Sequence, residues 1–155
     1  MTSDYHPTQL GQLLANFQSL EFVLRAFLQG LATARPLGIP YGIDIYIYPV
    51  GSEVPESELT SYDSLGKLIE KFNDEMNIRG LPNIDPGIVE IRDALAHGRI
   101  SSAFPNDYLR LIKFDKPIDG KVRVAFNELM TDTWFATQKK RVKDALLYVA
   151  NYLTR

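Results

Sequence analysis

Three residues near the middle of the chain have the types and spacing for acid–base chemistry on an anionic substrate. Arg92, Asp93 and His97 fall within one short segment, and His97 is one of two histidines in the sequence. Asp93 and His97 are four residues apart, so on a helix they share a face, and the carboxylate can orient the imidazole and favour its protonated form. The partial negative charge at a helix C-terminus acts in the same direction. We therefore take these three residues as the candidate catalytic site.

The spacing of the arginine and the histidine has a consequence for assembly. Arg92 is five residues from His97, which at a helical period of 100° per residue places the two side chains about 140° apart. On one straight helix they diverge. Either the long arginine curls round, or a second subunit brings its own helix alongside, so the spacing favours a dimer.

A capped helix is expected to carry these residues. Asp85 is a suitable N-cap, Pro86 suits the first helical position, and Gly98 suits the position just past the end. The pattern predicts a helix from about Pro86 to His97. Two structural interpretations stay open, because a histidine in the last turn can be a C-terminal cap and an arginine on a helix can be a surface ion-pair partner.

The most regular hydrophobic pattern begins at Leu10, where apolar residues recur every three or four positions and predict a long amphipathic helix. Positions 10, 17, 24 and 31 form a seven-residue ladder that could pack in a bundle or against a second copy. We expect Glu21 to pair with Arg25 on the surface; the alternative is a buried partner for a functional arginine. His6 is expected to lie in a frayed N-terminus.

Further elements follow along the chain. Thr60 and Asp63 form a capping box that would open a second helix. Alternation over residues 43–48 predicts a short strand, and two β-rich runs joined through Asp119-Gly120 predict a hairpin. The apolar face of the second helix is formed by Leu65, Leu68, Ile69, Phe72 and Met76. The two runs of the hairpin are Tyr108–Phe114 and Val122–Phe126. A last helix is predicted from about Thr133 to Leu153.

This order predicts a mainly α protein: a four-helix bundle with a β-hairpin inserted before the last helix, and a possible short extra strand at 43–48. Residues 1–155 are expected to form a single domain, because that length buries one hydrophobic core.

Composition narrows the function classes. The net charge of −2 gives no global positive field, so nucleic-acid contact would have to be local. The chain has no cysteine, no glycine-rich phosphate loop and no second histidine spaced to share a helical metal site with His97, so we expect no metal and no cofactor. No apolar run approaches a membrane span and no signal segment is evident, so we expect a cytoplasmic protein that does not bind membranes.

The run Ile91-Arg92-Asp93-Ala94-Leu95-Ala96-His97-Gly98 resembles the signature of HEPN domains, an Arg followed after four to six residues by a His, with a polar residue directly after the Arg. Many HEPN domains are metal-independent ribonucleases whose active site forms across a homodimer, several of them toxins or defence proteins. Others are inactive and serve as binding or dimerisation modules. The late motif helix and the long first helix suit that helical bundle.

The resemblance implies roles for the three residues. His97 would act as general base or acid at a 2′-hydroxyl, Arg92 would stabilise charge on the scissile phosphate, and Asp93 would hold the geometry. The implied partners are a second copy, RNA, and an antitoxin or other protein. Substrate would be attracted by Arg110, Lys113, Lys121 and Arg123 on the hairpin and by Lys139, Lys140, Arg141 and Lys143 on the last helix, unless these are simply solvated faces.

Two other functions stay open. A non-catalytic interaction module would use the motif helix and the first helix to bind a partner. A small-molecule binding domain would need an enclosed apolar pocket under the hairpin, lined by Tyr46, Tyr48 or their neighbours.

Overall fold

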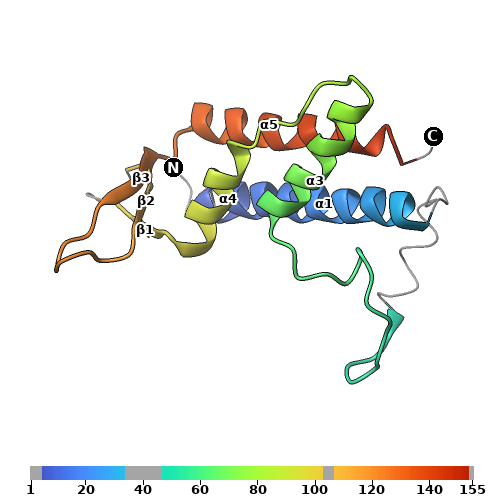
Figure 1. Ribbon diagram of the computed structural model, residues 1–155. Helices are drawn as coiled ribbons and strands as arrows, with labels where there is room; N and C mark the ends of the chain where they lie inside the picture. Colours follow the sequence, from blue (N-terminus) through green and yellow to red (C-terminus); the bar gives the residue numbers. More distant parts are fainter. Residues whose placement is uncertain (1–4, 34–46, 103–106, 154–155) are drawn as a thin grey trace. The chain divides into compact units, whose positions relative to one another are not determined.

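The computed structural model describes residues 5–33, 47–102 and 107–153, and in these ranges the chain is mainly helical with a small antiparallel sheet (Figure 1). This confirms the mainly α fold class and the hairpin before the last helix. Most of the predicted 43–48 strand lies outside the described residues, and Ile47 and Tyr48 belong to no strand. The elements are α1 Tyr5–Thr33, α3 Leu65–Ile78, α4 Ile88–His97, β1 Arg99–Ser101, β2 Arg110–Phe114, β3 Val124–Leu129 and α5 Asp132–Ala150.

The contacts of the chain group into two compact units. We call Met1–Ala15 with Gly87–Val142 the sheet unit, and Asn16–Pro86 with Lys143–Arg155 the helical unit. Helices α1 and α5 contribute residues to both units. A single domain over residues 1–155 stays a prediction.

The helical unit has an aromatic core. Phe27 of α1 and Phe72 of α3 meet edge to face with ring centroids 4.9 Å apart, and Tyr148 lies 5.9 Å from Phe72. All five apolar residues predicted for the α3 face are buried. The α1 ladder is also used inside the chain, because Phe17 and Leu24 are buried. That part of the ladder is therefore not available to a second copy.

The start of α3 differs from the prediction. Its N-cap is Ser64, whose hydroxyl accepts the Lys67 N–H, and the predicted Thr60/Asp63 capping box is wrong. The Thr60 hydroxyl instead accepts the N–H of Ser57 within a turn, and the Asp63 carboxylate pairs with a lysine of α3. Both candidate cap residues have other partners.

The sheet unit holds three antiparallel strands in the order β1-β2-β3. The β2–β3 hairpin was predicted, although β3 begins at Val124 rather than Val122. The register shifts within the pair of strands, because Phe114 is opposite Val124 whereas Lys113 is opposite Phe126. Asp119 and Gly120 both have positive φ, 50° and 73°, as the predicted Asp-Gly turn requires. Strand β1 was not predicted. It is three residues long and exposed throughout, so it leaves no alternating pattern to detect.

Helix α4 begins at Ile88, two residues after the predicted Pro86, and ends at His97 as predicted. Gly98 follows in an extended conformation, with φ −79° and ψ 179°, so the glycine is not needed for a left-handed turn. A glycine is needed at this position because neighbouring atoms leave no room for a Cβ. A Cβ at Gly98 would lie 2.3 Å from the Ala94 carbonyl oxygen and 2.9 Å from the Ile112 carbonyl oxygen. The end of α4 therefore packs directly on the backbone of β2.

The N-terminal end of α1 is ordered by polar contacts. The helix begins at Tyr5 rather than Leu10, and His6 is 8% exposed, so the expectation of a frayed His6 is wrong. The His6 Nε2 accepts the Leu109 N–H at 3.2 Å, and the Asp132 carboxylate accepts the hydroxyls of Tyr5 and Tyr108. These bonds hold the first turn of α1 to the starts of β2 and α5 within the sheet unit.

The packing at Gly98 predicts a large effect of one methyl group. Gly98→Ala should lower the free energy of unfolding by about 3 kcal/mol, because the added Cβ meets backbone atoms that cannot rotate away. Urea denaturation measures this. Gly11→Ala is the matched control, since a Cβ there meets nothing within 4 Å and alanine stabilises a helix by up to about 1 kcal/mol. Equal stability of Gly98→Ala and the parent would refute the close contact.

The Asp132 cluster predicts a pH-dependent contribution to stability. The hydroxyls of Tyr5 and Tyr108 hold the pKa of Asp132 below its usual value of 3.8. A depressed pKa stabilises the fold above the unfolded-state pKa, and this contribution is lost as the pH falls through the folded-state value. Asp132→Asn should therefore lower the Tm at pH 7, and its deficit should shrink towards pH 3.

The control for this experiment is Asp74→Asn, a change of the same kind at an exposed position of α3. Its Tm relative to the parent should not change with pH. A deficit of Asp132→Asn that is constant from pH 7 to pH 3 would contradict the proposed contribution of the carboxylate.

Candidate functional site

Helix α4 carries all three candidate catalytic residues. The guanidinium of Arg92 and the carboxylate of Asp93 form an ion pair with 3.6 Å between Nη1 and Oδ1, and both side chains are more than one third exposed. His97 is exposed at the last position of the helix. Within the described ranges no hydrogen bond joins Asp93 to the His97 imidazole. The structure thus brings Asp93 to Arg92, whereas the sequence analysis paired it with His97.

His97 does not cap the C-terminal end of α4. The Gly98 N–H donates to the Ala94 carbonyl at 2.7 Å and so closes the last turn. In the part of the chain that the structure describes, the imidazole of His97 has no hydrogen-bond partner. The backbone of Gly98 therefore performs the capping role, and the imidazole remains open to solvent.

A residue next to the motif extends the site onto the sheet. Arg99 is the first residue of β1, and its guanidinium lies over the Phe114 ring, 5.5 Å from the ring centroid. This pair was not predicted from the sequence. It depends on the pairing of β1 with β2, and β1 was not predicted.

Several predicted basic residues make polar contacts. Arg110 donates to the Asn127 side chain at 2.8 Å, and Arg123 pairs with Asp115 at 2.8 Å. Lys139 of α5 donates to two glutamine side chains of α1, at 2.6 and 2.9 Å. Lys139 is therefore held against α1, and Arg110 keeps guanidinium N–H groups beyond the one that bonds Asn127.

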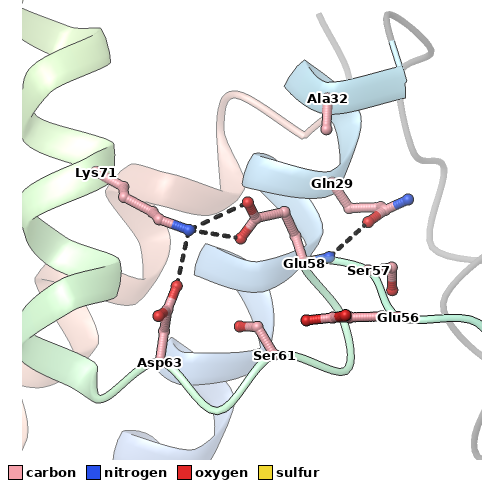
Figure 2. A pocket seen from close by; sticks show the side chains of 8 residues that line it. All are labelled: Gln29, Ala32, Glu56, Ser57, Glu58, Ser61, Asp63 and Lys71. Carbon is pink, nitrogen blue, oxygen red and sulfur yellow. Dashed lines mark hydrogen bonds and ion pairs between the residues drawn. The ribbon is translucent and has the colours of Figure 1, made fainter.

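The helical unit contains an open polar pocket of about 570 Å³ (Figure 2). Lys71 points into it and binds both Glu58 oxygens at 3.0 and 3.1 Å and the Asp63 carboxylate at 2.7 Å. These contacts raise the pKa of Lys71 and lower the pKa of Asp63, so both groups stay charged. The pocket is lined by Gln29, Ala32, Glu56, Ser57, Glu58, Ser61, Asp63 and Lys71.

This pocket is not the one that the sequence analysis anticipated. Tyr46 lies outside the described residues, and Tyr48 is half exposed and does not line the pocket. The lining is polar rather than apolar, and its lysine is already paired with two carboxylates. Its contacts fix the loop before α3.

Arg25 fixes the same loop from the other side. Its guanidinium donates to the Ser61 carbonyl and hydroxyl at 2.8 and 2.7 Å and to the Asp63 carbonyl at 2.8 Å. The guanidinium of Arg25 is thus directed to the loop, and its expected surface pair with Glu21 stays a prediction. A half-buried arginine bound to carbonyl oxygens is a structural residue here.

Among the described residues, no group of three or more His, Asp or Glu side chains is placed to hold a metal ion. In the same ranges, no helix is both long and apolar enough to cross a lipid bilayer. We found no protein-family model, curated protein or solved structure that matches this chain.

The contacts of Lys71 predict how the loop responds to losing this cation. Lys71→Met removes the ammonium group that bonds the carboxylates of both Glu58 and Asp63, and the loop should loosen. Hydrogen exchange at the Glu58 amide, which donates to Gln29 at 3.0 Å, should become several-fold faster. Lys67→Met is the control, because Lys67 pairs with the exposed Glu70 outside the pocket. Unchanged exchange in Lys71→Met would exclude Lys71 as the anchor of the loop.

Proposed function

We propose that this protein is a HEPN-like, metal-independent endoribonuclease acting in a toxin or defence system. The main support is the exposed imidazole of His97 at the end of α4, next to a glycine that fixes the helix end on the sheet. A histidine kept for packing or capping would be buried or bonded. The mainly helical composition agrees with a HEPN-like bundle of four helices.

The chemistry assigns one role to each residue. His97 takes the proton of the 2′-hydroxyl, the 2′-oxygen attacks the adjacent phosphorus, and the bond from phosphorus to the 5′-oxygen breaks. The leaving oxygen takes up a proton, and the products carry a 2′,3′-cyclic phosphate and a 5′-hydroxyl. Arg92 stabilises the charge that builds on the phosphate. Asp93, 3.6 Å from Arg92, positions the guanidinium rather than the imidazole.

The proposed active site is shared between two copies. Arg92 and His97 diverge by about 140° around one helix, so one copy presents them to different directions. In a two-fold dimer the arginine of one copy meets the histidine of the other at the same phosphate. The rival function, a non-catalytic HEPN-like dimerisation or protein-interaction module, is favoured by the Arg92–Asp93 ion pair, which already engages the arginine.

RNA cleavage by purified protein in excess chelator tests the proposal. His97→Ala and Arg92→Ala should each lower the cleavage rate by about 10²- to 10⁴-fold, because each removes a group that acts in the transition state. The parent should release 2′,3′-cyclic phosphate ends. Arg79→Ala in the helical unit is the control for losing an arginine and should cleave like the parent.

Mixing the two inactive variants tests the shared site. Mixed dimers hold one intact site of two, so an equal mixture should recover about a quarter of the parent rate. No recovery would place the site within one copy. Absence of cleavage by the parent on both single-stranded and structured RNA would overturn the nuclease and favour the interaction module.

A further inference from the structure

One face of the sheet carries mostly exposed side chains. Residues directly opposite in antiparallel strands share a face, and the register forms two rows across the three strands. These rows are Arg99–Ile112–Asn127 and Ser101–Arg110–Leu129. The opposite face carries Leu111 and Phe126, which are buried. We call the two rows with Phe114 the outer face.

The outer face carries two arginines, Arg99 and Arg110, and no acidic residue among the residues that define it. Arg99 is exposed and its guanidinium carbon lies over the Phe114 ring, 5.5 Å from the centroid, so one side of the guanidinium is directed to the ring. Its other side can stack on a planar ring, as guanidinium groups and aromatic side chains do with unstacked nucleobases. Arg110 lies in the next row, bonded to Asn127 at 2.8 Å, with further N–H groups for a phosphate.

The charge of this part of the chain suits a polyanion although the whole chain is acidic. Residues 99–123 carry more basic than acidic side chains. The basic ones are Arg99, Arg110, Lys113, Lys116, Lys121 and Arg123, and the acidic ones are Asp107, Asp115 and Asp119. The excess of positive charge thus belongs to β1, β2 and the connection to β3, and on the outer face itself it is carried by Arg99 and Arg110, which are the groups available for phosphate contacts.

The outer face begins beside the candidate catalytic histidine. His97 and Arg99 are two residues apart, so their Cα atoms lie within about 7 Å. The intervening Gly98 is packed on Leu111 and Ile112, which fixes this step of the chain. A strand of RNA with its scissile phosphate at His97 would therefore place a neighbouring nucleotide over Arg99.

We propose that the outer face binds single-stranded RNA, with one unpaired base stacked on the Arg99–Phe114 pair next to the phosphate at His97. The inference rests on the proposed function, because it places the nucleotides that flank the same cleavage site. Base-paired RNA is excluded from this contact, since its bases are already stacked on their neighbours. The substrate class is thereby an unpaired segment such as a loop or a single strand.

Binding is tested with a fluorescein-labelled single-stranded RNA of mixed sequence and the full chain carrying His97→Ala, which prevents cleavage. Arg99→Lys keeps the charge but loses the planar group, and should weaken binding about tenfold. Arg79→Lys is the matched control, because Arg79 lies over the Phe27 ring at 5.6 Å in the helical unit. It should bind like its parent, and a duplex of the same sequence should compete poorly.

The outcomes separate this inference from the proposed function. Binding that is insensitive to Arg99→Lys, or equal competition by the duplex, overturns the stacking site even if the protein cleaves RNA. Arg99-dependent binding by a protein that never cleaves supports the site and overturns the nuclease. In an active protein, Arg99→Lys should lower cleavage of a single strand mainly through KM, whereas His97→Ala lowers kcat.

Discussion

The close approach of Gly98 to β2 is the constraint on which the arrangement of the sheet unit depends. A helix end and a strand lie with backbone against backbone there, because the Ala94 and Ile112 carbonyls leave no room for a side chain. The contact lies between the end of α4 at His97 and the start of β1 at Arg99. His97 and Arg99 flank this contact on the chain, so their positions are fixed by the backbone rather than by their own side-chain contacts. A rigid support of this kind is what a precise catalytic or binding group needs.

Electrostatic differences between the two units follow from how their charges are used. In the helical unit Lys71 binds carboxylates and Arg25 binds carbonyl oxygens, so both cations hold the loop before α3 in place. In the sheet unit Arg99 rests on an aromatic ring and stays exposed. The same residue type thus serves structure in one unit and is open to a ligand in the other. A count of charges along the sequence does not distinguish the two uses.

The elements of the fold were predictable where the local pattern is strong. The α3 face from Leu65 to Met76, the end of α4 at His97 and the Asp119-Gly120 turn were all predicted, because each depends on residues close in sequence. Strand β1 was missed since it is short and exposed, and the α3 cap was misplaced because three polar residues compete there. The three motif residues on α4 were predicted, but the Arg99–Phe114 pair was not, because it depends on the register of β1 and β2. Register arises from long-range pairing that a single sequence does not encode locally.

The Arg25 contacts have a consequence for how this chain can diverge. Two of its main acceptors are the carbonyl oxygens of Ser61 and Asp63, and every amino acid supplies a carbonyl. At Ser61 and Asp63 the path of the loop is therefore held by Arg25 through backbone atoms, whereas the bonds of Glu58 and Asp63 to Lys71 need their carboxylates. Substitution of Ser61 would keep its carbonyl contact with Arg25, whereas substitution of Arg25 would remove both carbonyl contacts at once.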